Sequence, residues 1–240
     1  MAQLFAGTSG WAYPSWKPDF YPEKLAQKKF LSHYTTKLNT VEVNFTFRQL
    51  VKESTIQNWL AQSPAHFRFG VKAHQVITHI KRLKGTDEFV SRFLATIEPL
   101  AAAGKLGPVL FQLPPNLKAD PALLKEFLAT LPRTVPAAFE FRHESWFTDT
   151  TWELLKSANA GLCVAETETR TTPDVVTGSF AYYRFRKPTY TGEERREMVD
   201  RIGQHTAEGR NVFAYFKHEE TPQGALYAVE VLRDVNGVGS

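Results

Sequence analysis

The sequence contains a single cysteine, Cys163, among its 240 residues, so a fold held together by disulfides is excluded. It also lacks any apolar run of the roughly 20 residues that a membrane-spanning helix needs, and no membrane partner is predicted. The first five residues form neither a basic segment nor a long apolar stretch. A secretory signal peptide is therefore not expected, and we expect a cytoplasmic location.

The chain also lacks the short motifs that mark nucleotide and metal sites. No strand is followed by a Gly-x-Gly-x-x-Gly or a phosphate-loop sequence, and there is no His-Glu-x-x-His motif or cysteine cluster. No repeat or Gly/Ser linker interrupts the sequence, so residues 1–240 are expected to form a single domain. An apolar content of 42% is ample for one core, and a net charge of +4 fits an anionic ligand without establishing nucleic-acid binding.

What the sequence does contain is a regular alternation of short apolar runs with amphipathic segments. This order predicts parallel strands joined by helical crossovers, and we expect an α/β fold with a single (β/α)8 TIM-type barrel. Only about fifteen residues of poor helix-forming composition separate the sixth and seventh runs, so a short or absent helix is predicted there. The predicted strands are Leu4–Thr8, Thr40–Asn44, Phe67–Lys72, Val109–Leu113, Ala137–Phe141, Leu162–Ala165, Phe180–Arg184 and Val212–Phe216.

Residue alternation along these strands assigns polar side chains to one face of the sheet. In the third strand Phe67, Phe69 and Val71 alternate with a polar set that ends in Lys72 and His74. The polar residues collect toward the carboxyl ends of the strands, where the active sites of such barrels are built. The predicted tip residues are Thr8, Glu42, Asn44, Lys72, His74, Gln112, Glu140, Arg142, Glu166 and Arg184. They predict either a binding pocket or a buried ion-pair plug, and their place at the top of the barrel favours the pocket.

The pocket residues suit acid–base chemistry on a bound anion. We predict Glu42, Lys72, His74 and Glu140 as catalytic residues, with a glutamate as general base and His74 as the acid. Substrate binding is assigned to Thr8, Trp11, Tyr13, Asn44, Gln112, Arg142, Glu166 and Arg184. A metal held by Glu42, His74, Glu140 and Glu166 is a weaker alternative, because the cations would compete with it; no metal is predicted. A Schiff base on Lys72 is a further alternative.

The segment after the first strand is the most aromatic in the chain. Residues 10–22 hold five aromatic side chains and three prolines, a composition that suits a rigid lid stacking on a ring. Trp11 and Tyr13 lie nearest the strand tip and are the predicted ring contacts. The alternative is that these aromatic side chains only seal the barrel mouth.

Several sequence blocks follow one another in order along the chain. They are Gly7-Thr8-Ser9-Gly10-Trp11, Asn39-Thr40-Val41-Glu42-Val43-Asn44, Val71-Lys72-Ala73-His74, Ile77-Thr78-His79, Phe111-Gln112-Leu113-Pro114-Pro115 and Glu140-Phe141-Arg142-His143. Together these blocks resemble the DUF72 (YecE-like) family. The resemblance covers essentially the whole chain and implies a TIM-type barrel, but it supplies no reaction, because the function of the family is unknown.

Two segments depart from the family pattern. After the seventh strand many members resemble Arg-x-His-Gly, whereas this chain has Arg184-Phe185-Arg186-Lys187. After the eighth strand the usual Tyr-Phe-Asn is replaced by Tyr215-Phe216-Lys217-His218. Barrels often bind phosphate at these two loops, so the added charge predicts either tighter anion binding or a partly lost family site.

Three functions follow as hypotheses. The first is an enzyme acting on a small anionic, ring-bearing substrate, by hydrolysis of a phosphate ester or nucleotide-like compound. The second is a non-catalytic module that binds a nucleotide or single-stranded nucleic acid, with strongly salt-dependent affinity. The third is a lyase or isomerase that depends on Lys72.

Overall fold

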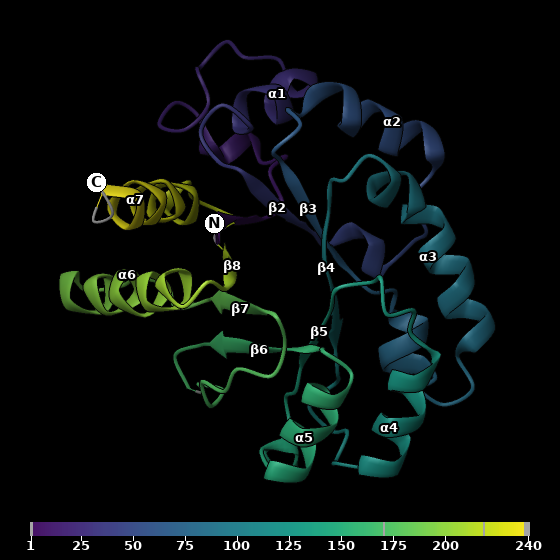
Figure 1. The fold of residues 1–240 in the computed structure, drawn as a ribbon. Coiled ribbons are helices and arrows are strands. Elements are labelled where there is room, and N and C mark those ends of the chain that lie inside the picture. Colours follow the sequence, from purple (N-terminus) through teal and green to yellow (C-terminus); the bar gives the residue numbers. More distant parts are fainter. Residues whose placement is uncertain (1, 170, 218, 238–240) are drawn as a thin grey trace.

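The computed structural model describes residues 2–169, 171–217 and 219–237. Its eight parallel strands pair in sequence order and close into a barrel, with β1 hydrogen-bonded to both β2 and β8 (Figure 1). The strands are β1 (Leu4–Ser9), β2 (Thr40–Val43), β3 (Arg68–Lys72), β4 (Leu106–Gln112), β5 (Ala137–Glu140), β6 (Gly161–Glu166), β7 (Phe180–Phe185) and β8 (Asn211–Phe216). The predicted (β/α)8 barrel is confirmed, with every predicted strand present.

The helices surround the barrel, and α6 and α7 lie side by side on one flank (Figure 1). No helix occurs between β6 and β7 among the described residues there, as the composition of that connection predicts. None of the described helices has the length and apolar composition to span a membrane. The α-helices are α1 (Phe30–Tyr34), α2 (Glu53–Gln62), α3 (Asp87–Ala102), α4 (Pro121–Thr130), α5 (Asp149–Ser157), α6 (Gly192–Ala207) and α7 (Gln223–Gly237).

Local signals explain where two of the helices begin. The Asp120 side chain accepts a hydrogen bond from the Leu123 amide at the start of α4. Thr191 and Glu194 form a reciprocal capping box at the start of α6. Thr86 precedes α3, but its hydroxyl donates to the Leu83 carbonyl and does not cap the helix.

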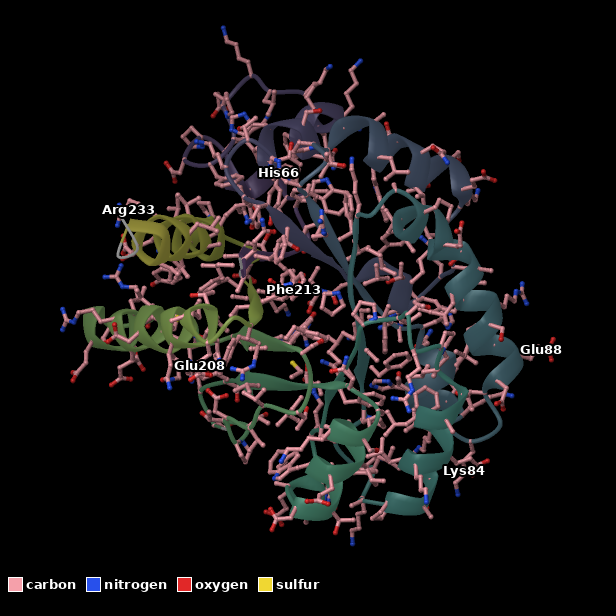
Figure 2. All side chains as sticks on the ribbon, viewed as in Figure 1. His66, Lys84, Glu88, Glu208, Phe213 and Arg233 are labelled. Atoms are coloured by element: carbon pink, nitrogen blue, oxygen red, sulfur yellow. The ribbon has the colours of Figure 1, made fainter. Side chains whose placement is uncertain are left out.

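Two separate cores follow from the alternation of side chains. Apolar residues on the outer faces of the strands pack against the helices. A smaller cluster fills the barrel interior, and Figure 2 shows one of its members, Phe213, near the centre of the molecule. This inner cluster consists of Phe5, Leu110, Ala138, Cys163, Ala165, Phe180, Tyr182, Phe213 and Tyr215. The lumen below the strand tips is therefore packed mainly with apolar and aromatic side chains.

Candidate active site at the barrel mouth

The centre of the site is one arginine held between two glutamates. Arg184 at the end of β7 donates from Nη2 to Glu42 Oε1 on β2, at 2.7 Å, and from Nη1 to Glu140 Oε2 on β5. All three side chains are at most 1% exposed. The alternation along three distant strands therefore brings these predicted residues together as a buried ionic bridge across the barrel.

Further donors, all neutral except Arg142, complete the hydrogen bonding of both carboxylates. Tyr182, Ser9 and Asn44 donate to Glu42 at 2.6, 2.8 and 3.0 Å. Gln112 and Arg142 donate to Glu140 Oε1 at 2.8 and 3.0 Å. Buried charges are tolerated only when they are paired and hydrogen-bonded in this way.

This environment decides the protonation state of the two glutamates. Burial alone would raise the pKa of Glu42, but the charges of Arg184 and Arg186, with the hydrogen bonds, lower that pKa to about 2. The same balance of burial against arginine charge places the pKa of Glu140 far below its usual range. Both carboxylates are ionised at neutral pH and strongly paired. They are therefore better suited to holding the cations in position than to acting as the predicted general base.

Lys72 lies beside this bridge at the end of β3. Its Nζ donates to Gln112 Oε1 at 2.8 Å and lies 4.1 Å from the centre of the Phe47 ring. Burial, followed by the charge of Arg184, lowers the pKa of Lys72 to about 8. Lys72 can therefore hold or release a proton close to neutral pH, unlike an ordinary lysine.

Arg186 is a further member of the site that was absent from the predicted site residues. Alternation along β7 places it on the same face as Tyr182 and Arg184, so the sequence did contain the signal. Its positive charge lowers the pKa of both Glu42 and Glu140. Its Nε is buried without a hydrogen-bond partner, and no described carboxylate forms an ion pair with it. This guanidinium is thus the strongest candidate for contact with a ligand.

The mouth consequently carries more positive than negative charge. Lys72, Arg184 and Arg186 interact with both Glu42 and Glu140, and Arg142 pairs with Glu140. Among the described residues of this group, four cations therefore face two anions, which leaves an excess of two positive charges. An ion-pair plug would be balanced, whereas Arg184 with the two glutamates carries one net negative charge and the three other cations convert it to an excess of two positive charges, which favours anions.

The structure places His74 away from the mouth, which corrects its predicted role. The chain leaves the sheet after Lys72, so the strict alternation ends before residue 74. The His74 ring accepts a hydrogen bond from the Val76 amide at 3.2 Å and packs against Phe89 of α3, 5.1 Å between ring centres. Among the described residues, His74 forms no hydrogen bond or ring contact with Arg184, Glu42 or Glu140, so the structure lends no support to its predicted role as the acid.

A different histidine, His79, lies at the mouth. It follows β3 in a π-helical turn, Val76–Ile80, and its ring meets the Phe47 ring edge-on at 4.8 Å. Burial and then the charges of Lys72 and Arg142 lower the pKa of His79, so the neutral imidazole is favoured. Its Nδ1 is 2.9 Å from the Thr78 hydroxyl. In the sequence, the Ile77-Thr78-His79 block of the family resemblance was the signal that could have pointed to His79. Residue alternation does not apply in this turn, so it could not show which way the His79 side chain points.

Two predicted binding residues lie outside the mouth because they occupy the opposite strand face. Thr8 hydrogen-bonds Tyr34 of α1 at 2.9 Å, and its neighbour Ser9 contacts Glu42 instead. Glu166 adjoins Ala165, which faces the interior, so Glu166 points outward. There it pairs with Lys187 at 2.9 Å and approaches Arg201 at 3.7 Å.

The aromatic loop after β1 mainly seals the barrel. Trp16, Phe20 and Tyr21 are almost fully buried in the outer core, which confirms the alternative interpretation for this part of the loop. Trp11 is half-buried with its ring edge-on to Trp59 of α2, at 5.6 Å. The Tyr13 hydroxyl donates to the Ser9 carbonyl at 2.8 Å, and burial raises the pKa of Tyr13 to about 12. Tyr13 is thus a neutral wall of the site.

The metal alternative does not fit the positions of its four residues. Glu42 and Glu140 are held by Arg184, whereas His74 and Glu166 lie elsewhere. Over the described ranges, no three His, Cys, Asp or Glu side chains gather as metal ligands. We therefore derive no step through a metal at these residues.

The fold and the mouth together define a TIM-type barrel protein with a cationic site at the carboxyl ends of its strands. The model of the family described as "Protein of unknown function DUF72" matches residues 5–238. The chain therefore belongs to the DUF72 family, which confirms the resemblance seen in the sequence.

Known relatives agree with this assignment. A DUF72 family protein from Thermotoga maritima superposes with a TM-score of 0.86 at 25% identity, covering 98% of this chain and 99% of that one. The UPF0759 protein YunF from Bacillus subtilis is 28% identical over 156 residues, which are 62% of this chain and 54% of YunF. The UPF0759 protein YecE from Escherichia coli is 31% identical over 146 residues, 60% of this chain and 50% of YecE. The matches thus span about half the length of these curated relatives.

The two departures from the family pattern have different structural consequences. Arg186 faces the mouth, but Lys187 turns outward to Glu166 and Glu194, both at 2.9 Å. Lys217 is exposed and lies 3.5 Å from Glu219, and His218 is outside the described residues. Of the added charges that are described, Arg186 is the one that joins the mouth.

Proposed function

We propose that the protein is an enzyme that binds a small anionic, ring-bearing substrate in the barrel mouth and hydrolyses its phosphate ester. The excess of two positive charges around Glu42 and Glu140 carries this proposal. A phosphate monoester has about −1.5 to −2 charges at pH 7, which would neutralise that excess.

The cations divide into two groups in this proposal. Arg184 is occupied by both glutamates and acts as a positioning residue. Arg186, Lys72 and Arg142 surround this bridge and contact the phosphate oxygens. Planar guanidinium groups suit phosphate because they donate two parallel hydrogen bonds.

The proton transfers are assigned to His79 and Lys72. The neutral His79 imidazole takes a proton from the attacking water as the new bond from oxygen to phosphorus forms. The bond from phosphorus to the ester oxygen breaks, and protonated Lys72 gives its proton to that leaving oxygen. The pKa of about 8 for Lys72 suits this role, since the group is protonated at neutral pH yet releases a proton readily.

The proposal is tested by phosphate binding and by turnover. We expect Arg186→Gln to weaken the binding of inorganic phosphate at least tenfold by isothermal titration calorimetry, because a hydrogen bond to a charged group contributes about 1.5–3 kcal/mol. His79→Gln should abolish hydrolysis of aryl phosphates while leaving phosphate binding intact. Arg92→Gln is the matched control, because Arg92 is exposed on α3. Equal phosphate affinity in Arg186→Gln and the wild type would contradict the proposal.

A second candidate function, a lyase or isomerase that forms a Schiff base, is favoured by one observation. The pKa of Lys72 is lowered to about 8, so half of its amine is neutral at that pH and can attack a carbonyl carbon. The amine and carbonyl would condense to an imine with release of water. Borohydride reduction with pyruvate or a sugar phosphate should then add a stable mass to Lys72. Lys105 is the control, since its amine bonds to the Leu60 and Ser63 carbonyls; no adduct on Lys72 would dismiss this candidate.

A further inference from the structure

An open hollow adjoins the mouth, over the loops that follow β4, β5 and β6. Its volume is about 800 Å³, and it is lined by Pro115, Arg142, Glu144, Phe147, Thr167 and Thr169. Pockets for small ligands usually measure about 300–1,000 Å³. We propose that this pocket binds the nucleoside part of a nucleoside monophosphate whose phosphate occupies the mouth, an inference that rests on the proposed function and specifies its substrate.

The pocket is continuous with the mouth through one shared residue. Arg142 lines the pocket, and its Nε donates to Glu140 Oε1 at 3.0 Å in the mouth. Its side chain is 29% exposed, whereas that of Glu140 is 1% exposed. Arg142 thus passes from the buried ionic bridge to the accessible pocket, so a ligand bound by its phosphate beside Arg142 extends directly into this pocket.

The lining offers the two kinds of contact that a nucleoside needs. Phe147 is half-buried, and its ring is held nearly parallel to Trp152, 22° between planes and 6.2 Å between centres. Phe147 and the exposed Pro115 provide apolar surface for the face of a base. The hydroxyls of Thr167 and Thr169 and the exposed carboxylate of Glu144 suit the hydroxyl groups of a sugar.

The aromatic loop after β1 is a poorer place for the ring. Trp16, Phe20 and Tyr21 are at most 3% exposed, so they offer no face to a ligand. Trp11 is partly covered by its contact with Trp59. The ring contact predicted for that loop is therefore reassigned to Phe147, on the opposite part of the barrel.

Calorimetric titration with inorganic phosphate, AMP and adenosine tests the proposal. AMP should bind the wild type at least tenfold more tightly than phosphate. Phe147→Ala should weaken AMP binding about 5- to 150-fold, the range expected for loss of one stacking contact, and leave phosphate binding unchanged. Phe147→Tyr, which retains the ring, should restore AMP binding. Phe45→Ala is the matched control, because Phe45 is an exposed aromatic residue after β2, 36% accessible.

The outcomes separate this inference from the proposed function. Failure of phosphate to bind, with AMP and adenosine still binding in a way that depends on Phe147, would refute the phosphate site and leave the nucleoside pocket standing. Phosphate binding that AMP does not exceed would refute the pocket and leave the proposed function intact. Equal AMP affinity in Phe147→Ala and the wild type, or a loss in Phe45→Ala instead, would also overturn the assignment.

Discussion

Replacing Arg184 by methionine tests the ionic bridge directly. The side chain is 1% exposed between two buried carboxylates, and methionine fills much of the same space without the charge. Removing one partner of a buried ion pair costs about 3–5 kcal/mol, because the other charge stays buried without compensation. Here two carboxylates lose their partner. We expect a loss of about 5 kcal/mol, which is a large part of the 5–15 kcal/mol that stabilises a typical domain.

The loss should depend on pH in a defined direction. In the wild type the pKa values of Glu42 and Glu140 are lowered, so their contribution to stability is complete above the unfolded value of about 4.5 and falls as the pH decreases toward the folded values. In Arg184→Met, burial dominates and raises both pKa values above 4.5. The variant then gains stability by protonation as the pH falls. The difference between the two proteins should therefore be largest at pH 7 and smaller at pH 5.

Urea unfolding followed by tryptophan fluorescence at pH 7 and pH 5 measures both effects. Arg142→Gln is the matched control, because its partly exposed pair with Glu140 should contribute about 1 kcal/mol or less. Adding Glu140→Gln to Arg184→Met should recover part of the loss, since one uncompensated charge disappears. A loss below about 1 kcal/mol in Arg184→Met, or an equal loss at both pH values, would refute this explanation of the bridge.

Four further predictions concern groups with distinct surroundings. Competitive acetylation should show Lys72 half-reactive near pH 8, because burial and Arg184 lower its pKa; a value near 10.5 would contradict this environment. Asn39→Ala should cost about 1–3 kcal/mol in thermal unfolding, because the Asn39 amide satisfies a carbonyl and an amide of β1 at 2.7 and 3.0 Å, and an unchanged midpoint would contradict that role. Tyr183→Phe should cost a similar amount, because its hydroxyl joins Asp174 and His205. Burial lowers the pKa of His205, so wild-type stability should fall as the pH drops below about 6.5, and a flat profile would contradict it.

The barrel and most of its mouth could be predicted from the sequence because both follow from simple periodicities. Apolar runs such as Val109–Leu113 mark strands, and alternation within each run decides which side chains face inward. Glu42, Lys72, Gln112, Glu140 and Arg184 meet in the structure because they occupy inner positions near strand ends. Their proximity can therefore be predicted from strand position alone, without knowledge of any contact between them.

The wrong assignments come from two limits of alternation. Its phase must be correct to one residue, and it can stop beyond a strand end, as it does after β3, although Arg186 just after β7 still follows it. Thr8 and Glu166 are outer-face residues next to the inner-face residues Ser9 and Ala165, so an error of one position reverses the direction of the side chain. His74 lies beyond the end of β3, where the chain turns and the period no longer applies. Loop geometry, which the sequence does not encode periodically, places His79 at the mouth instead.

These corrections also change the electrostatic character of the site. With Glu166 included, the predicted acids nearly balance the predicted cations, as in a structural plug. The structure removes Glu166 to the outer face and adds Arg186, and each change increases the positive charge of the mouth by one. The resulting excess lies around a bridge that keeps both remaining carboxylates ionised. Because both Nη groups of Arg184 already bind Glu42 and Glu140, the anion of the proposed function would be held by Arg186, Lys72 and Arg142, and the surroundings of these three residues would select it.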